Sequence, residues 1–429
     1  MKVKITPSTV TGAVTMPPSK SYTHRAIILG SLASGVTIIE DPLLSDDTRH
    51  TIAACRSLGA DIDLPDNRLL IIGTGGHIKA RQDGERIFVG NSGTTVRMIA
   101  SVAALAQETV VLDGDERIRQ RPMNDLLSAL ESQGVYARSL NNDGCPPIEI
   151  KGGRIAGGEV MISGSVSSQH ISSLLMIAPY AEREMNLRVV DVFRSRPYID
   201  MTIDAMHAFG VNVVNFSYIE FRIKNDRGYE GRQYKIEGDY SSAAYFFAAA
   251  AIGGSAISVK NLRFYTKQGD RYFLDILAEM GCSVDNLEGE VRLSRNQELK
   301  NITVDMSDYP DIVPPLAVVA AYAGGKTEIT NIGHLRFKES DRIGDTAVEL
   351  GKMGIKTEVT DNTLVIYGGK PKGAQLEAHN DHRLAMSFAI AGIFAEGETV
   401  INGAETVTKS YPSFFADLAS IGAKVEELP

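Results

Sequence analysis

The stretch PPSKSYTHRAIILGSLASG, residues 17–35, decides how the rest of the chain is interpreted. Two prolines end an extended segment, polar and basic residues follow at once, and an apolar run then leads to a glycine. This order is typical of a strand that turns into a buried helix, because Ser caps helix starts and Gly ends helices at low cost. We therefore predict a helix over about residues 21–33, with Lys20 at its N-terminus.

The same design recurs five times along the chain. The other polar helix starts are Asn91-Ser92-Gly93-Thr94, Ser165-Val166-Ser167-Ser168-Gln169, Asp239-Tyr240-Ser241-Ser242, Tyr309-Pro310-Asp311 and Asn380-Asp381-His382-Arg383. Matched positions from Ser21 to Asp381 are separated by 72, 74, 74, 70 and 70 residues. A nearly constant period over the whole chain indicates one structural unit copied six times.

A second marker keeps the same period. Six glycines are spaced by 75, 76, 71, 73 and 68 residues, namely Gly59, Gly134, Gly210, Gly281, Gly354 and Gly422. We expect each to end a second helix in the left-handed conformation that Gly adopts easily. Each unit is then a strand, a buried helix, a strand, a second helix and one or two closing strands, which makes the chain an α/β protein. Single Ala-rich helices of unrelated α/β proteins resemble one another. Such chance resemblance would not give two separate markers, the helix starts and the glycines, with the same period.

Length and composition are those of an ordinary globular protein of 429 residues, 43% hydrophobic and 23% charged. Single cores stop growing near about 250–300 residues, so two domains of three units each are expected. The longest apolar run, 243–252, is shorter than the roughly 20 residues that span a bilayer, and the N-terminus lacks a signal-peptide core. Three isolated cysteines, Cys55, Cys145 and Cys282, suit a reducing compartment. We expect a cytoplasmic enzyme without a metal or other cofactor.

Cations gather at the helix starts although the net charge is −9. The acidic balance argues against a nucleic-acid surface. The seven cations are Lys20, Arg25, Arg121, Lys338, Arg342, Arg383 and Lys409. Helix N-termini favour anions, and two phosphorylated substrates that also carry carboxylates would bring roughly −5 to −6 charges in total. Lys338 and Arg342, four residues apart, are expected to share one helix face.

Hydroxyl, glycine and carboxylate groups accompany these cations. The strand–turn–helix segment 90–97 allows backbone N–H groups to approach a phosphate or carboxylate closely, with Gly93 leaving room. Ser167, Ser168, Ser195 and Tyr198 add hydroxyl donors. Asp311 and Glu339 stand among the bases, where neighbouring cations favour the charged form that suits a general base; simple charge balance is the alternative.

With these residues assembled, the chain resembles the 5-enolpyruvylshikimate-3-phosphate synthases of the enolpyruvyl transferase family. The motifs that carry the resemblance are Pro18-Ser19-Lys20-Ser21 with Arg25, Gly90-Asn91-Ser92-Gly93-Thr94 with Arg97, Arg121-Pro122, Ser167-Ser168-Gln169, Arg196-Pro197-Tyr198, Glu237-Gly238-Asp239-Tyr240-Ser241-Ser242, Pro310-Asp311, Lys338-Glu339-Ser340-Asp341-Arg342, Asn380-Asp381-His382-Arg383, and Lys409 with Pro412. Each motif is modest alone, but the ordered set covers nearly the whole chain.

The resemblance implies two domains, each of three βαβαββ-type repeats around buried helices, an inside-out α/β barrel. The chain would cross between the domains twice, and its first strand would pair with the C-terminal half. One domain, the phosphoenolpyruvate side, would comprise residues 1–18 and 238–429. The other, the shikimate 3-phosphate side, would comprise residues 19–237.

The resemblance also implies the reaction: the enolpyruvyl group of phosphoenolpyruvate moves to the 5-hydroxyl of shikimate 3-phosphate, and phosphate leaves through a tetrahedral intermediate. It assigns shikimate 3-phosphate to Lys20, Ser21, Arg25, Ser167, Ser168, Gln169, Ser195, Tyr198, Asp311 and Lys338. It assigns phosphoenolpyruvate to Lys20, Asn91, Gly93, Arg121, Gln169, Arg342, Arg383 and Lys409. Asp311 would be the base, and Glu339 the acid, with Lys20 a participant. The partners are then two small molecules bound by a monomer, with no nucleic acid and no membrane.

Two positions depart from the family pattern. His334 stands where relatives have Asn, so that contact to shikimate 3-phosphate is not carried over. Met98 follows Arg97 where plant and enterobacterial members have Pro, and the family's sensitivity to glyphosate is not carried over either.

Three rival functions stay open at the level of sequence. The sister transferase that acts on UDP-N-acetylglucosamine uses a reactive Cys on the loop before its Arg-Pro motif, and residues 115–120 contain none. An RNA 3′-phosphate cyclase-like enzyme and a non-enzymatic anion-binding scaffold are the others. The acidic net charge and the paired carboxylates argue against both.

Overall fold

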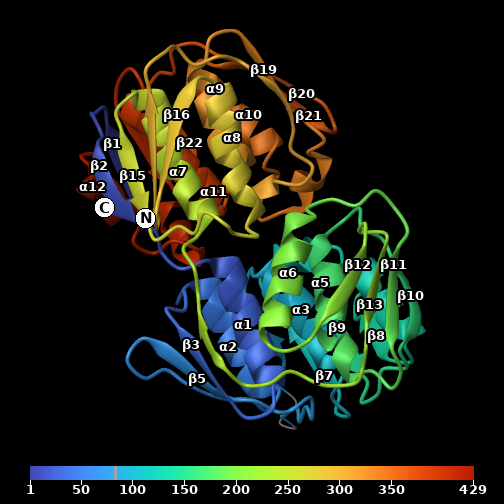
Figure 1. Cartoon of the computed structure of the whole chain (residues 1–429). Coiled ribbons are helices and arrows are strands. Elements are labelled where there is room, and N and C mark those ends of the chain that lie inside the picture. Colours follow the sequence, from blue (N-terminus) through green and yellow to red (C-terminus); the bar gives the residue numbers. More distant parts are fainter. Residues whose placement is uncertain (82–84) are drawn as a thin grey trace. The chain divides into compact units, whose positions relative to one another are not determined.

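The computed structural model describes residues 1–81 and 85–429, which divide into two compact units. The inserted unit is Lys20–Ile236. The terminal unit joins Met1–Ser19 to Glu237–Pro429 and therefore holds both ends of the chain. The chain passes between the units twice (Figure 1).

The inserted unit contains three repeats of similar order. The first has α1 (Lys20–Leu32), β3 (Val36–Glu40), α2 (Asp46–Ser57), β4 (Asp61–Asp63) and β5 (Arg68–Ile72). The second has β6 (Ile87–Phe88), α3 (Gly93–Ala103), β7 (Val110–Asp113), α4 (Asn124–Ser132), β8 (Tyr136–Ser139) and β9 (Ile148–Lys151). The third has β10 (Gly158–Ile162), α5 (Ser168–Ile177), β11 (Met185–Val189), α6 (Pro197–Ala208), β12 (Val213–Phe216) and β13 (Glu220–Ile223), and β14 (Gln233–Lys235) follows.

The terminal unit repeats this order after two N-terminal strands, β1 (Lys2–Thr6) and β2 (Gly12–Thr15). The fourth repeat has α7 (Tyr240–Gly253), β15 (Ile257–Lys260), α8 (Tyr272–Glu279), β16 (Cys282–Leu287) and β17 (Glu290–Arg295). The fifth has β18 (Thr303–Asp305), α9 (Val313–Tyr322), β19 (Lys326–Thr330), α10 (Gly344–Lys352), β20 (Lys356–Val359) and β21 (Thr363–Tyr367). The sixth has β22 (Gln375–Glu377), α11 (His382–Phe394), β23 (Thr399–Asn402), α12 (Phe414–Ser420) and β24 (Lys424–Leu428).

The strands form separate four-stranded sheets, one for each repeat. The orders are β14-β3-β5-β4, β6-β7-β9-β8 and β10-β11-β13-β12 in the inserted unit, and β16-β17-β15-β2, β18-β19-β21-β20 and β22-β23-β1-β24 in the terminal unit. In each sheet one edge strand pairs in parallel and the other pairs are antiparallel. Over the described ranges the sheets are not joined into a closed barrel, so the fold is a mixed α/β arrangement of sheets around helices.

Strand exchange completes the sheets at the crossing points. β2 precedes α1 in the chain but pairs in parallel with β15 of the fourth repeat, while β14 pairs in parallel with β3 of the first. β1 lies between β23 and β24 and takes the place of the closing strand that the sixth repeat lacks. The implied pairing of the first strand with the C-terminal half is therefore confirmed.

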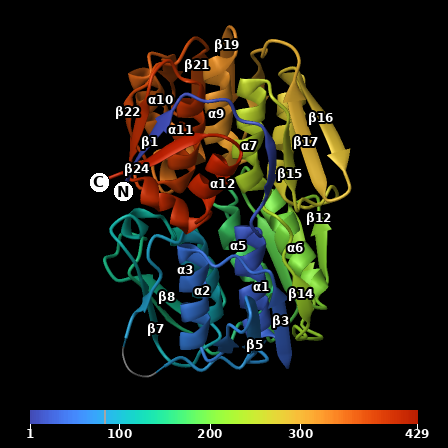
Figure 2. The same ribbon diagram turned by 90° about the vertical axis from the view of Figure 1, so that its left-hand side faces the viewer.

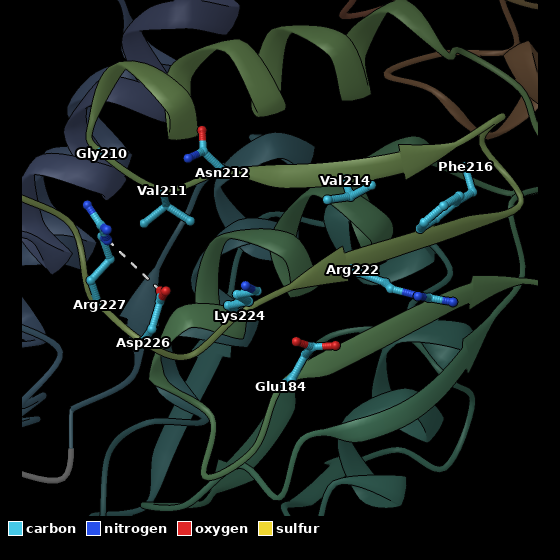
Figure 3. Close-up of a pocket in the computed structure, with 10 residues that line it drawn as sticks. All are labelled: Glu184, Gly210, Val211, Asn212, Val214, Phe216, Arg222, Lys224, Asp226 and Arg227. Atoms are coloured by element: carbon cyan, nitrogen blue, oxygen red, sulfur yellow. Dashed lines mark ion pairs between the residues drawn. The ribbon is translucent and has the colours of Figure 1, made fainter.

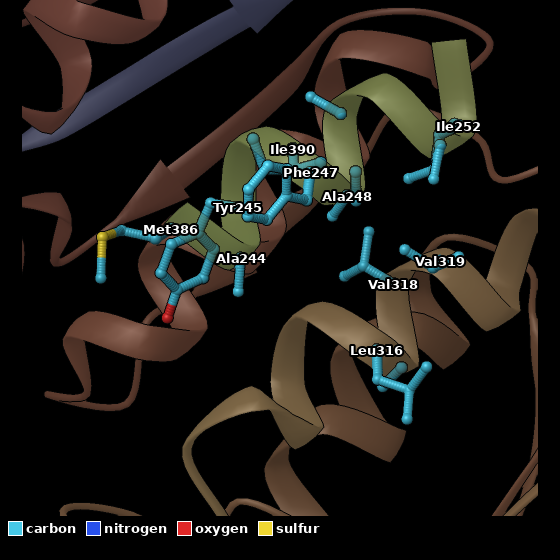
Figure 4. Packing of buried hydrophobic residues seen from close by; sticks show 14 of the residues in the cluster. Ala244, Tyr245, Phe247, Ala248, Ile252, Leu316, Val318, Val319, Met386 and Ile390 are labelled. Atoms are coloured by element: carbon cyan, nitrogen blue, oxygen red, sulfur yellow. The ribbon is translucent and has the colours of Figure 1, made fainter. Parts of the chain in front are cut away.

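The first helix of every repeat is buried on nearly all sides. In the terminal unit α7, α9 and α11 are mostly apolar, whereas α1, α3 and α5 of the inserted unit also bury polar side chains. In the inserted unit, α3 packs against both α1 and α5 (Figure 2). In the terminal unit, α7, α9 and α11 pack together, with Tyr245 and Phe247 facing apolar side chains of the neighbouring helices (Figure 4). Each large side chain buried in this way contributes roughly 1.5–3 kcal/mol.

The predicted repeat markers are found where the sequence placed them. The first helices begin within about two residues of the predicted positions, and all six glycines, Gly59, Gly134, Gly210, Gly281, Gly354 and Gly422, have positive φ angles between 83° and 106°. No helix within residues 1–81 and 85–429 is long and apolar enough to cross a membrane.

Candidate active-site residues

The polar helix starts of the inserted unit are fixed by their own side chains. Ser92 precedes α3 and its hydroxyl accepts a hydrogen bond from the backbone N–H of Thr95 at 3.3 Å. Ser167 precedes α5 and accepts from the N–H of Gln169 at 3.3 Å. Each cap satisfies one N–H of its helix start, and in α5 the N–H of His170 also donates to the Ser167 carbonyl at 3.2 Å. N–H groups at a helix start that have no such partner are the ones that can bind a ligand.

Arg25 is a buried cation whose described partners are all neutral. Its side chain is 1% exposed; Nε donates to Thr202 Oγ1 at 2.8 Å, Nη1 to the Ser21 carbonyl at 2.9 Å and Nη2 to the Tyr198 carbonyl at 2.8 Å. Burial lowers the pKa of Arg25 to about 10, because no carboxylate of the described residues offsets the cost of removing the charge from water. Three of the predicted shikimate 3-phosphate residues, Ser21, Arg25 and Tyr198, thus lie together.

Lys20 lies at the first residue of α1 and pairs with Asp47 of α2 at 3.1 Å. Both side chains are largely buried, 12% and 9% exposed. A cation at a helix N-terminus is unfavourable next to the helix dipole, and the sequence led us to expect a bound anion as compensation. In the structure, the carboxylate of Asp47 supplies part of this compensation.

Gly93, the first residue of α3, makes room for a guanidinium. A Cβ at this position would lie 2.4 Å from Cζ of Arg121. Arg121 is 3% exposed and therefore lies buried against the start of α3. Asn91, two residues earlier, is 7% exposed, and neither atom of its amide has a hydrogen-bond partner within the described part of the chain. A buried amide without partners is costly, so Asn91 is suited to bind a ligand.

Gln169 is oriented by two neighbours on α3. Its carbonyl accepts from Arg97 at 2.9 Å and its amide donates to Thr94 at 2.9 Å. Ser168, at the first residue of α5, is 4% exposed. Ser195 is 5% exposed and has a φ of +58°, an uncommon conformation for a residue with a side chain.

In the terminal unit, a network of carboxylates surrounds Arg342, which is 1% exposed. Its Nε pairs with Asp381 at 2.7 Å, Nη1 with Asp311 at 2.9 Å and Nη2 with Glu339 at 2.7 Å. Burial alone would lower the pKa of Arg342, but the carboxylates of Asp381, Glu339 and Asp311 outweigh it and raise the pKa above its ordinary value. This arginine is firmly charged.

Arg383 shares Asp311 with Arg342. Its Nη2 pairs with Asp311 Oδ2 at 2.7 Å, so both oxygens of Asp311 are held by guanidinium groups. Asp381 caps α11 by accepting from the N–H of Arg383 at 2.9 Å. The structure therefore brings Asp311, Glu339, Arg342 and Arg383 into one network.

Lys409 and Lys338 stand on short connecting segments of the terminal unit. Lys409, at the end of a short helix over Ala404–Lys409, donates to the Asn380 carbonyl at 2.8 Å. Lys338 follows another short helix, Gly333–Phe337, which also carries the buried His334. Both lysines thus stand on connecting segments that precede a second helix.

The prediction that Lys338 and Arg342 share a helix face is wrong. The segment between them is not helical, and α10 begins only at Gly344. The side chain of Asp341 accepts from the N–H groups of Ile343 at 3.2 Å and Gly344 at 3.1 Å, so it caps the helix after the charged residues. Arg342 is thereby turned toward the carboxylates instead.

A hollow of about 430 Å³ in the inserted unit lies apart from all these residues (Figure 3). It is lined by Glu184, Gly210, Val211, Asn212, Val214, Phe216, Arg222, Lys224, Asp226 and Arg227. Its charged side chains are of both signs, and none of the predicted site residues reaches it.

Comparison with known proteins shows the family of the chain. A family model described as EPSP synthase (3-phosphoshikimate 1-carboxyvinyltransferase) matches residues 5–418. The chain belongs to the EPSP synthase family. Proteins named 3-phosphoshikimate 1-carboxyvinyltransferase from Methanococcus vannielii and Methanothermobacter thermautotrophicus are 42% and 44% identical, over 98% and 96% of both chains. An EPSP synthase structure from Acinetobacter baumannii has a TM-score of 0.83 at 30% identity and covers 99% of this chain and 100% of its own.

In this EPSP synthase family member, sequence reasoning missed carboxylates that hold the cations. Asp381 and Asp47 were absent from the predicted site, yet they pair with Arg342 and Lys20. Asp270 was also missed; it is 4% exposed, its Oδ2 is bound by the Ser241 hydroxyl, and burial followed by the charge of Asp311 raises its pKa to about 7. The available signal was position, since each carboxylate follows or precedes a helix start by a few residues.

Proposed function

We infer that the chain transfers the enolpyruvyl group of phosphoenolpyruvate to the 5-hydroxyl of shikimate 3-phosphate and releases phosphate. This is the step that 3-phosphoshikimate 1-carboxyvinyltransferases perform on the route to chorismate and the aromatic amino acids. The observation that carries the inference is the family match over residues 5–418, which includes every residue proposed for the site. The arrangement of cations and carboxylates supports it chemically.

For shikimate 3-phosphate we propose a set of donors centred on the buried Arg25. Its charge is uncompensated among the described residues, so a phosphate would supply the missing anion. The proposed residues are Lys20, Ser21, Arg25, Ser167, Ser168, Gln169, Ser195, Tyr198, Asp311 and Lys338.

For phosphoenolpyruvate we propose the cations that can match its phosphate and carboxylate. Arginine forks bind both groups through paired N–H donors. The proposed residues are Lys20, Asn91, Gly93, Arg121, Gln169, Arg342, Arg383 and Lys409.

The proposed chemistry is addition followed by elimination. Asp311 accepts the proton of the attacking 5-hydroxyl while Glu339 protonates the methylene carbon, with Lys20 as a participant. Two guanidinium groups hold Asp311 as a carboxylate, and this favours the base form. The 5-oxygen bonds to the central carbon, and the C–O bond to phosphate then breaks as the methyl group formed by protonation gives a proton back to Glu339 and becomes methylene again. The cations stabilise the charge that develops on phosphate and carboxylate.

The sister reaction on UDP-N-acetylglucosamine is the second candidate, and the cysteines argue against it. A reactive thiol needs a lowered pKa. Burial, followed by the Asp143 carboxylate, raises the pKa of the Cys145 thiol, and burial raises that of Cys55 to about 12. Neither thiol is an activated nucleophile.

We further propose that the protein acts as a monomer in the cytoplasm and binds no nucleic acid. Size measurement in solution with and without both substrates tests the first point. A dimer that forms only with substrate would contradict it.

The decisive experiment measures phosphate release from phosphoenolpyruvate. We expect release with shikimate 3-phosphate and none with UDP-N-acetylglucosamine. A matched control omits the acceptor, to exclude simple phosphatase activity. Release supported by UDP-N-acetylglucosamine and not by shikimate 3-phosphate would refute the proposal.

A further inference from the structure

A chain of buried polar side chains links three helices of the inserted unit. His24 Nδ1 lies 2.7 Å from Thr51 Oγ1, Thr51 Oγ1 lies 2.7 Å from Thr95 Oγ1, and Thr95 Oγ1 lies 2.7 Å from Ser92 Oγ. Each of the four side chains is 0% exposed. We call this the hydroxyl network; none of its members is among the residues proposed to bind substrate.

The hydroxyl network connects helix starts that carry proposed ligands. His24 is on α1 four residues after Lys20, Thr51 is on α2, and Ser92 and Thr95 flank the first residues of α3. The Thr95 hydroxyl lies 3.3 Å from the backbone carbonyl of Asp47, whose side chain pairs with Lys20. One set of bonds therefore runs from the Lys20 ammonium to the turn that contains Asn91 and Gly93.

Side-chain packing does not require the hydroxyl groups of Thr51 and Thr95. Val has nearly the shape of Thr and would pack at positions 51 and 95 without a buried hydroxyl to satisfy. Buried polar networks favour one arrangement of their helices, because a shift that breaks one of their hydrogen bonds leaves a buried polar group without a partner. Such a network suits a place where small displacements matter.

The direction of the hydrogen bonds follows from His24. Burial, and then the charge of Lys20, lowers its pKa well below the ordinary value, so the imidazole is neutral. Its Nε2 has no hydrogen-bond partner within the described residues. A buried N–H without an acceptor is rarer than a buried acceptor without a donor, which favours the proton on Nδ1. His24 then donates to Thr51, Thr51 to Thr95, and Thr95 to Ser92 or to the Asp47 carbonyl.

We propose that the hydroxyl network, which links α1, α2 and α3, fixes the position of Lys20 relative to the Asn91–Gly93 turn. Thr51 and Thr95 are then positioning residues for phosphoenolpyruvate. The inference rests on the proposed function for the identity of the ligand. A misplacement of about 1 Å can cost roughly 100-fold in rate, so loosening three helix starts is expected to be visible in kinetics.

The test replaces Thr51 by Val and by Ser in the full-length protein. We expect Thr51→Val to raise the KM for phosphoenolpyruvate about tenfold, because the proposed binding residues on α1 and α3 are then no longer held at fixed positions relative to each other. The dissociation constant for shikimate 3-phosphate should change less than the KM for phosphoenolpyruvate, since Lys20 is proposed for both substrates but Arg25 and its partners keep their bonds. Thr51→Ser keeps the hydroxyl and should restore the KM to within about twofold of the original value.

Ser101→Ala is the matched control. The Ser101 hydroxyl donates to that of Ser173 at 2.8 Å, and both residues are 0% exposed. This bond also joins two helices of the same unit, but it lies about 12 Å along α3 from Gly93 at 1.5 Å per residue. We expect Ser101→Ala to lower thermal stability as Thr51→Val does and to leave the KM for phosphoenolpyruvate unchanged.

The proposal is overturned if Thr51→Val keeps the original KM, or if Ser101→Ala raises it equally. Should Thr51→Val fail to fold, Thr95→Val breaks the same network from α3 and carries the same expectation. The ¹⁵N shifts of His24 test the network without any variant; a proton on Nε2 or a charged ring would contradict it. An inactive wild-type protein would refute the proposed function. The ¹⁵N shifts of His24 would still show whether the hydrogen bonds of the network are present.

Discussion

Arg25 of the inserted unit and Arg342 of the terminal unit are both 1% exposed, yet their surroundings differ. Arg25 donates to a hydroxyl and two carbonyls. Arg342 pairs with three carboxylates. The pKa of Arg25 is lowered to about 10 by burial, whereas that of Arg342 is raised because the carboxylates outweigh its burial.

The difference shows two ways to prepare a site for anions. Around Arg25 no carboxylate among the described residues compensates the charge, and we propose that a ligand's phosphate does so. Around Arg342 carboxylates already compensate the charge, so in the proposed function an incoming anion competes with the residues proposed as acid and base. Lys20 with Asp47 at 3.1 Å is the intermediate case.

The largest effect is expected for Asp311→Asn. Asn keeps the size of the side chain but cannot accept the proton of the 5-hydroxyl. We expect turnover to fall roughly 10²- to 10⁴-fold, the usual loss on removing a general base. The dissociation constant for shikimate 3-phosphate, from calorimetry, should change less than about tenfold.

The control for this change is Asp361→Asn, which alters an exposed turn of the same unit. It should leave turnover unchanged. If Asp311→Asn lost binding and kept turnover, Asp311 would be a ligand and not the base.

Arg342→Gln and Arg25→Gln test the comparison directly. Arg342→Gln leaves three carboxylates together without their cation, and breaking a buried ion pair costs about 3–5 kcal/mol of unfolding free energy. Arg25→Gln removes a charge that nothing in the described unit compensates, so the loss should be smaller, about 1–2 kcal/mol. Urea unfolding measures both.

Arg25→Gln should instead weaken shikimate 3-phosphate, by about 10- to 100-fold, because a charged hydrogen bond to phosphate is lost. Equal losses of stability in the two variants would show that the compensation of charge does not distinguish the units.

The buried carboxyl group of Asp270 in the terminal unit predicts a pH dependence of stability. Burial, and then the charge of Asp311, raises its pKa to about 7, above the value of about 3.9 in an unfolded chain. The folded protein therefore keeps a proton that the unfolded chain releases, and stability from this group falls as the pH rises from about 4 to 7. The fall is at most about 1.4 kcal/mol per pH unit.

Asp270→Asn removes this titration and keeps the bond to Ser241 possible. The stability of the variant relative to the original protein should rise between pH 4 and 7 and stay level above that range. A difference independent of pH would show that Asp270 is ionised in the folded protein. Thermal melts across the pH series give the answer.

Much of this organisation was predictable from local patterns in the sequence. The periods of helix starts and glycines placed the repeats, because a cap and a left-handed glycine act within a few residues. The exchange of β2 and β14 was not predictable in the same way, since parallel edge strands leave no spacing signal of their own.

The ion pairs and hydrogen bonds of the buried cations were harder to predict from the sequence. Arg25 bonds Thr202, 177 residues away, and Arg383 bonds Asp311, 72 residues away. Sequence reasoning singled out these cations and Asp311, but it could not say which cations were already paired with carboxylates. The Lys338–Arg342 helix failed for a local reason, the capping by Asp341.

The smallest effect is expected at Gly93, where the guanidinium of Arg121 lies against the start of α3. A Cβ would lie 2.4 Å from Cζ and Nη1 of Arg121, so Gly93→Ala must displace the guanidinium. We expect about a tenfold rise in the KM for phosphoenolpyruvate, close to 1.4 kcal/mol, with an unchanged dissociation constant for shikimate 3-phosphate. Gly351→Ala in α10 is the control, because nothing lies within 4 Å of its Cβ, and it should change neither constant. An unchanged KM in Gly93→Ala would mean that Arg121 binds from a second position equally well, and the helix start would then contribute to the site through its N–H groups alone.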